Sequence, residues 1–270
     1  MKLAQDQICQ YERDGILFIP NYLSETEINI LHHAISQLPD DIPGKAMEKD
    51  NKTLRAIHGF HIYNSIFLDL IKHPLLLEPS QQILGSSVYL YQFKINMKAP
   101  FSGDLWPWHQ DYAFWYEEDA MPEPKAISVG IFLDEVNHFN GPLYYILGSH
   151  KEGLITFSAR QYSGESGWES NVSADLKYCL DNKTIARLVE RGGITAPIGS
   201  AGSVLFFHSN IAHASVPNIS PYPRRLLIIT YNSIDNIPCS NKKPRPEFLV
   251  SQNHMPLSVT NDGVLFQRQI

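Results

Sequence analysis

The run VYLYQFKINMKA, residues 88–99, is where the sequence changes from a helical to a β pattern. Alternation along it predicts a strand that places one set of side chains on each face: Tyr89, Tyr91, Phe93 and Ile95 on one, Leu90, Gln92, Lys94 and Asn96 on the other. Three more runs rich in β-branched and aromatic residues follow at 126–136, 202–215 and 224–234, separated by turn residues. The sequence therefore predicts a mainly β chain with an antiparallel jelly-roll core and flanking helices.

The regions outside these strands are predicted to be helical or irregular. Residues 1–87 have helical periodicity, with a capping box that begins at Ser24 and a break or kink at Pro74. A polar, irregular stretch at 151–192, with one helix near its end, is expected to be an insertion that serves as a lid. No linker separates two domains, so we expect a single domain over 1–270 with the N-terminal part packed on the barrel.

Composition excludes several classes of function. Hydrophobic residues make up 43% of the chain, charged residues 19%, and the formal net charge is −6. Without a long basic block we expect no nucleic-acid partner, and no apolar run approaches the roughly 20 residues that span a membrane. The N-terminus lacks a signal peptide's apolar core, and the three cysteines form no CxxC pair, which favours a cytoplasmic protein. Any metal must therefore be held by histidine and carboxylate.

A histidine and an aspartate lie two positions apart within the aromatic run WPWHQDYAFW, residues 106–115. If this segment is extended, the side chains of His109 and Asp111 lie on the same face and can bind one ion together. Two histidines and one carboxylate leave three positions open on Fe(II), as in non-haem oxygenases. The alternative is a core strand with two incidental polar residues, in which Trp106, Trp108 and Trp115 are ordinary core rather than pocket walls.

A second polar group lies in the run FFHSNIAHASVPNISPYPRRLLIITYN, residues 206–232. It offers His208 and His213 as alternative third ligands, with Ser215 following the second. An arginine binds a carboxylate through two parallel hydrogen bonds, as a site for a 2-oxoacid requires. Arg224 and Arg225 should face opposite ways on a strand, which leaves Arg225 as a surface charge.

These segments together resemble a known family. The block WHQDYAFWYEEDAMPEPKAISVGIFLDEVNHFNGPLYYILGSHK, residues 108–151, matches the patterns W-H-x-D, W-x-x-E-D-x-M/L-P, N-G-P-L and G-S-H in order. The patterns H-x-S, N-I-S/T-P and P-R follow between His213 and Arg224. The chain thus resembles the phytanoyl-CoA dioxygenase superfamily of Fe(II)/2-oxoglutarate oxygenases, in particular its ectoine hydroxylases and free-leucine hydroxylases. The resemblance implies a cupin-like double-stranded β-helix.

The resemblance also implies the metal and co-substrate residues. Iron would be ligated by His109, Asp111 and His213, which form the catalytic centre, with His208 instead a packed strand histidine. 2-Oxoglutarate would be bound by Lys94, Trp106, Ser128, Ser215 and Arg224. Lys94 stands where the ectoine enzymes have an arginine, and Trp106 where they have a phenylalanine. O2 would be the second co-substrate.

The substrate is expected to be a small free amino acid. Gln92 and Trp115 match substrate-binding positions of the ectoine enzymes, whereas Leu226 stands where those enzymes have a substrate-contacting asparagine. Leu226 disfavours ectoine and favours an aliphatic side chain, so we expect hydroxylation of L-leucine at its C5 methyl, with succinate and CO2 released. Arg55 either binds the substrate carboxylate or forms a surface ion pair. The alternatives are a carrier- or CoA-tethered acyl substrate, or a non-catalytic jelly-roll binding protein.

Overall fold

The helices begin and end at residues that satisfy their free backbone groups. Ser24 accepts a hydrogen bond from the Glu27 N–H at 3.3 Å, and the Glu27 carboxylate accepts one from the Ser24 N–H at 2.7 Å, which confirms the capping box. One helix ends at Gly15, whose φ of +80° suits glycine, and another begins at Pro74. The helices are α1 Gln5–Asp14, α2 Glu25–Ser36, α3 Ser65–Ile71, α4 Pro74–Leu84, α5 Asp111–Asp119 and α6 Asn182–Gly192, with 3₁₀ turns η1 Phe60–Ile62 and η2 Ser149–Glu152.

The strands form antiparallel sheets in this computed structural model, which describes residues 2–155, 158–159, 168, 176–239 and 244–260. The major sheet has the order β1-β11-β6-β13-β4-β3-β2, the minor sheet β10-β7-β12-β5, and β8 pairs with β9. The strands are β1 Ile16–Ile19, β2 Lys45–Met47, β3 Leu54–His58, β4 Val88–Lys98, β5 Trp106–His109, β6 Ala126–Phe132, β7 Leu143–Ile146, β8 Ser158–Ala159, β9 Tyr178–Cys179, β10 Ile194–Thr195, β11 Val204–His208, β12 His213–Ser215 and β13 Arg224–Ser233.

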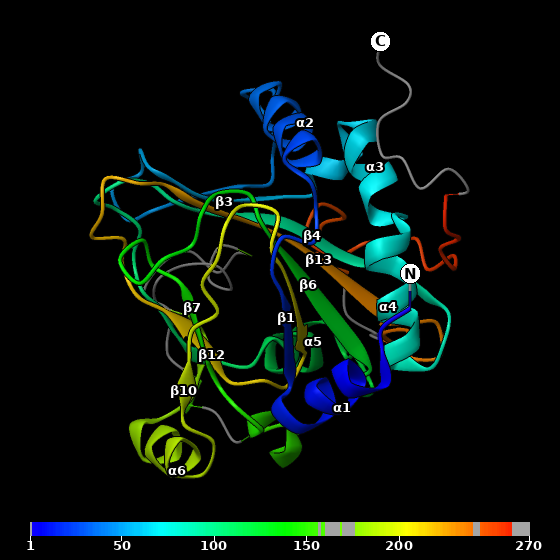
Figure 1. Cartoon of the computed structure of the whole chain (residues 1–270), viewed down its shortest axis with the longest axis vertical. Coiled ribbons are helices and arrows are strands. Elements are labelled where there is room, and N and C mark those ends of the chain that lie inside the picture. Colours follow the sequence, from blue (N-terminus) through cyan, green and yellow to red (C-terminus); the bar gives the residue numbers. More distant parts are fainter. Residues whose placement is uncertain (1, 156–157, 160–167, 169–175, 240–243, 261–270) are drawn as a thin grey trace.

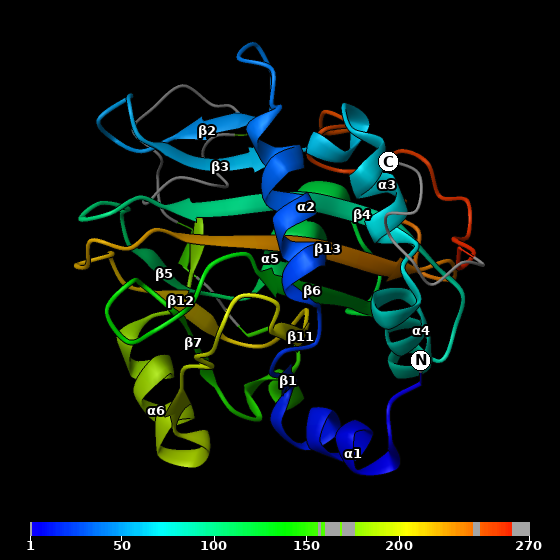
Figure 2. The ribbon, with the colours of Figure 1, turned by 45° about the horizontal axis from the view of Figure 1, so that its top comes forward.

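The major sheet lies between a layer of helices and the minor sheet (Figures 1 and 2). Phe206 and Leu227 point to the helical side, where they belong to an apolar cluster that includes residues of α1, α2, α3 and α4. Their neighbours Phe207 and Ile228 point the other way and pack in a second cluster with Tyr145 of β7. This arrangement confirms the predicted jelly-roll core, and the site described below lies on the side of the major sheet that faces the minor sheet.

The strand β4 departs from the simple alternation that the sequence predicts. A register shift between Thr230 and Tyr231 of β13 leaves Tyr91 as an extra residue in β4. As a result Leu90 and Phe93 both belong to the helix-facing cluster, while Tyr91 packs with Trp115 on the other side. The expected assignment of faces was therefore wrong for the first half of the strand. The bulge keeps the tyrosines and the polar residues that follow on the side of the site.

The N-terminal part contributes more than helices, because β1 pairs with β11 and β3 pairs with β4 at opposite ends of the major sheet. Within the expected lid at 151–192, residues 156–157, 160–167 and 169–175 lie outside the described residues, and α6 forms near its end as predicted. Among the helices that the structure describes, none combines the length and apolar character needed to cross a membrane.

Candidate active site

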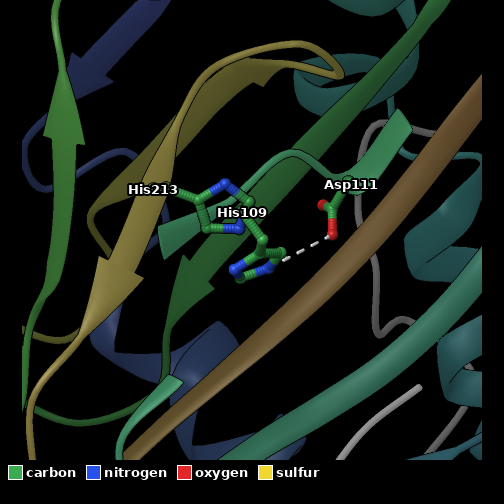
Figure 3. A group of neighbouring side chains, drawn as sticks. All are labelled: His109, Asp111 and His213. Atoms are coloured by element: carbon green, nitrogen blue, oxygen red, sulfur yellow. Dashed lines mark ion pairs between the residues drawn. The ribbon is translucent and has the colours of Figure 1, made fainter. Parts of the chain in front are cut away.

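The side chains of His109, Asp111 and His213 point toward one another (Figure 3). His109 is the last residue of β5 and lies directly opposite His213, the first residue of β12. The extended segment ends at Gln110, whose side-chain amide donates to the carbonyl groups of Gly153 and Asn210. Asp111 is therefore the first residue of α5. The H-x-D pattern suggests instead that it lies in an extended segment with His109. The turn into the helix aims its carboxylate at the two imidazoles.

The geometry of this triad fits a single divalent metal ion. One ligand atom from each of the three buried residues lies within 4.8 Å of the others, and His109 Nε2 is 3.9 Å from Asp111 Oδ1. His208, the alternative ligand, instead accepts a hydrogen bond from the Asn210 N–H at 2.9 Å through Nδ1 and lies beside the His150 ring. Among the described residues, His213 is thus the histidine that completes the triad.

Backbone contacts fix which ring nitrogens of the triad are available. His109 Nδ1 lies 2.6 Å from the Pro107 carbonyl oxygen, and His213 Nδ1 lies 3.1 Å from that of Ile211. Because a carbonyl can only accept, each Nδ1 carries the proton and each Nε2 presents a lone pair. Burial, followed by the neighbouring His213, lowers the pKa of His109 to about 3, and burial lowers the pKa of His213. Both rings are neutral, the state in which imidazole ligates a metal.

The third ligand, the Asp111 carboxylate, has a lysine beside it that favours its ionised form. Lys94 Nζ lies 3.9 Å from Asp111 Oδ1. Burial alone would raise the pKa of the Asp111 carboxyl, but the charge of the Lys94 ammonium holds it below its usual value. A carboxylate and two neutral imidazoles are the donor set of the facial triad that holds Fe(II) in oxygenases. The residues present therefore fit the metal that the sequence predicts.

The triad lines a cavity whose empty space, part of it open to solvent, is about 800 Å³. Arg224 lines it, is only 2% exposed, and donates from Nε and Nη2 to the Gly141 carbonyl oxygen. Burial lowers the pKa of Arg224 to about 10, so the guanidinium stays charged at neutral pH. No ion pair to Arg224 occurs among the described residues, and the buried hydroxyl of Ser215, which also lines the cavity, has no partner. These two groups together match one end of a dicarboxylate.

The other expected site residues divide into two groups. Gln92, Lys94, Trp106 and Trp115 line the cavity. Ser128 and Leu226 are not among its lining residues: the Ser128 hydroxyl is 3.0 Å from that of Thr230, and Leu226 packs in the apolar cluster between the sheets. Ile228, two residues along the strand from Leu226, lines the cavity instead. Of the three tryptophans, Trp108 packs against a separate cluster that includes Leu180 and Leu188.

The two remaining arginines of the sequence analysis have structural partners. Arg225 faces away from the cavity, as expected, and binds both carboxylate oxygens of Asp134, at 2.9 and 2.6 Å. Arg55 is 1% exposed, so the expected surface ion pair was wrong. Its guanidinium is 2.9 Å from the buried Glu48 carboxylate and 3.9 Å from the centre of the Trp106 ring. Arg55 thus contacts a wall of the cavity from behind rather than lining the cavity itself.

We expect Arg55→Ala to lower the free energy of unfolding by about 3–5 kcal/mol, because it leaves the Glu48 carboxylate buried without this partner. Denaturant unfolding followed by circular dichroism measures the change. The control is Arg13→Ala, since the Arg13 side chain is 69% exposed in its ion pair with Asp14. That variant should unfold like the unaltered chain. Equal stability of the two variants would contradict a structural role for the Arg55–Glu48 pair.

The cavity also contains polar residues that sequence reasoning missed. His58, Asn96 and Arg245 line it, together with the apolar side chains of Trp168 and Leu249. Arg245 belongs to the short basic stretch NKKPRPE, residues 241–247, which the sequence alone predicts to be a solvated loop, yet its side chain is 13% exposed. Its Nε and Nη2 donate to the two oxygens of Asp119, at 2.7 and 2.5 Å. The Asp119 carboxylate also accepts a hydrogen bond from the Tyr91 hydroxyl.

Comparisons with known proteins agree with this geometry. A family model described as phytanoyl-CoA dioxygenase matches residues 11–226. An L-proline trans-4-hydroxylase of Streptomyces griseoviridis is 39% identical over 254 residues, covering 93% of this chain and 94% of the relative. An ectoine dioxygenase of Bordetella bronchiseptica is 34% identical, with coverages of 93% and 83%. The crystal structure of EctD from S. alaskensis with 2-oxoglutarate and 5-hydroxyectoine superposes with a TM-score of 0.80 at 28% identity, covering 96% and 87% of the two chains.

Proposed function

Because this chain belongs to the phytanoyl-CoA dioxygenase family and is an Fe(II)- and 2-oxoglutarate-dependent dioxygenase, we propose that it hydroxylates the side chain of a free aliphatic amino acid. The observation that carries the proposal is the presence of the His109–Asp111–His213 triad and the Arg224–Ser215 pair around one cavity. These residues would hold a dicarboxylate with one end near the metal ligands and the other at the guanidinium. A non-catalytic binding protein has no need of this combination.

Iron held by the triad would supply activation of O2, which takes two electrons from the oxidation of 2-oxoglutarate to succinate and CO2 and two from the conversion of a C–H bond to an alcohol. The residues of this chain orient both organic molecules and keep water away. Arg224 and Ser215 hold the distal carboxylate of 2-oxoglutarate, and Lys94 keeps Asp111 ionised. Trp106 and Trp115 contribute aromatic surface that excludes water from the reacting centre.

The remainder of the cavity suits a small molecule that bears one carboxylate. Arg245 provides a second guanidinium, separate from the co-substrate arginine and bound through Nε and Nη2 by Asp119, and Gln92 provides an amide on the same wall as Lys94. Apolar contacts come from Ile228, Leu249 and Trp115. A cationic group beside apolar surface matches the carboxylate and aliphatic side chain of an amino acid. An acyl group tethered to a carrier or to CoA would need its long arm to pass through the mouth.

Two amino acids are the leading substrate candidates. The L-proline trans-4-hydroxylase relative, similar over nearly its whole length, supports L-proline with hydroxylation at C4. The resemblance to free-leucine hydroxylases supports L-leucine with hydroxylation at the C5 methyl. Leu226 does not line the cavity, so it no longer favours leucine over proline, and we place L-proline first.

We expect succinate release from 2-oxoglutarate to rise at least about tenfold above the substrate-free rate with L-proline or L-leucine. Purified protein with Fe(II) and 2-oxoglutarate would be incubated with each proteinogenic amino acid and with ectoine. Succinate and a product heavier by one oxygen atom would be measured by mass spectrometry. A stearoyl-CoA reaction serves as the test of a tethered substrate. Turnover of the acyl-CoA alone, or of no amino acid, would contradict the proposal.

A further inference from the structure

His58 lies in the cavity at a place that the metal and co-substrate do not use. It is the last residue of β3 and sits directly opposite Lys94 in the β3–β4 pair. Side chains of directly opposed residues lie on the same face of a sheet, so His58 shares the wall from which Lys94 reaches Asp111. Its backbone N–H donates to the Gly44 carbonyl oxygen at 2.8 Å, which fixes the end of the strand.

The imidazole of His58 is buried and incompletely satisfied. The residue is 4% exposed, and Nε2 has no hydrogen-bond partner among the described residues. Its ring packs edge-on against Trp168, with centroids 5.9 Å apart. Burial, followed by the charges of Lys94 and Arg245, lowers the pKa of His58 to about 3, so the ring is neutral throughout the physiological range. A buried polar atom without a partner is costly in a folded protein, and because His58 lines the cavity, a ligand bound there can satisfy its ring nitrogen.

The position of His58 in the sheet indicates whether it lies near the co-substrate or near the substrate. Arg224, the co-substrate arginine, lies opposite Lys98 in the β13–β4 pair. Lys98 is four residues along β4 from Lys94, a separation of about 13 Å. His58 is therefore distant from the distal carboxylate of 2-oxoglutarate. After burial, the charges that act on the His58 ring are those of Lys94 and Arg245, and both would repel an ammonium group there. Asp111 and Asp119 partly compensate these two cations, so a hydrogen-bond donor such as His58 adds to what holds an anion at this wall.

We propose that His58 is a specificity-determining residue that donates a hydrogen bond to the carboxylate of the amino acid substrate, which it holds together with Arg245. This inference rests on the proposed function and adds the group that distinguishes a free carboxylate from an amide or ester. A neutral donor beside a guanidinium favours a carboxylate oxygen, which accepts from both. A carboxamide would place its own N–H against one of the two donors, and that donor would have no acceptor.

The test compares His58→Phe, which keeps an aromatic ring without its nitrogens, with His58→Gln, which keeps a side-chain N–H donor. KM is measured separately for 2-oxoglutarate and for whichever free amino acid the unaltered chain turns over, and for the carboxamide of that amino acid. We expect His58→Phe to raise KM for the amino acid about tenfold or more and to leave KM for 2-oxoglutarate within about twofold. Preference for the acid over its carboxamide should fall, and His58→Gln should recover part of it.

His61→Phe is the matched control, because His61 is also a buried histidine with an unpartnered ring nitrogen but packs against Phe93, which faces the helices. It should change neither KM, and thermal unfolding reports whether each variant is folded. An unchanged amino-acid KM in a folded His58→Phe variant, or an equal rise in both KM values, overturns the role of His58 alone. If the unaltered chain neither turns over nor binds any amino acid in calorimetry, the proposed function itself fails.

Discussion

Replacement of Asp111 with asparagine is expected to lower 2-oxoglutarate-dependent turnover by at least about a thousandfold, well beyond the 10–100-fold typical of residues that only orient a ligand. The carboxylate is the one anionic member of the triad, and it lies between two neutral imidazoles and the Lys94 ammonium. An asparagine of the same shape offers a neutral oxygen and leaves the charges of the metal and the lysine uncompensated in a buried site.

Iron content after anaerobic reconstitution and the rate of succinate formation measure this effect together. The matched control is Asp181→Asn, because Asp181 caps α6 at 2.9 Å from the Thr184 N–H and asparagine caps helices equally well. The control should keep its iron and its rate. An Asp111→Asn variant that retains stoichiometric Fe(II) and turns over within tenfold of the unaltered chain would refute the role given to this carboxylate.

Replacement of Arg224 with glutamine should raise KM for 2-oxoglutarate by about 30- to 4,000-fold, the equivalent of about 2–5 kcal/mol for one partner of a buried charge pair. The guanidinium is buried, charged, and free of any ion pair to a described carboxylate, so the co-substrate is the anion that it can compensate. Arg224→Lys should be intermediate, because an ammonium keeps the charge but cannot form two parallel hydrogen bonds.

Initial rates at varied 2-oxoglutarate concentration provide the measurement. Arg225→Gln is the control, since the neighbouring Arg225 faces away from the cavity and binds Asp134. It should leave KM for 2-oxoglutarate unchanged. If the glutamine variants of Arg224 and Arg225 gave the same KM, the co-substrate carboxylate would have to bind elsewhere.

Residues close together in the sequence allowed much of the site to be predicted. His109 and Asp111 are two positions apart, so either a strand or a short turn brings them near one another. His213 and Ser215 lie on one short strand that pairs with β5, and the alternation of Arg224 and Arg225 held because β13 is regular at that point. The capping box at Ser24 and the break at Pro74 were also predicted, because caps and proline act on local backbone geometry.

Other features depended on contacts between distant segments. The bulge at Tyr91 results from the pairing of β4 with β13, and periodicity within β4 alone does not reveal it. Leu226 and Ile228 share a face, so which of them reaches the cavity depends on the minor sheet and its side chains. The sequence around Arg245 predicts a solvated loop because nothing nearby pairs with the arginine. Its partner, Asp119, lies 126 positions away in the chain.

The most direct measurement of the central claim is a crystal structure of the protein grown anaerobically with Fe(II) and 2-oxoglutarate. It should show an iron ion, identified by its anomalous peak, coordinated by Nε2 of His109, Nε2 of His213 and the carboxylate of Asp111. The distal carboxylate of 2-oxoglutarate should lie on Arg224 and Ser215. Iron coordinated elsewhere, or a co-substrate whose distal carboxylate is far from Arg224, would contradict the account.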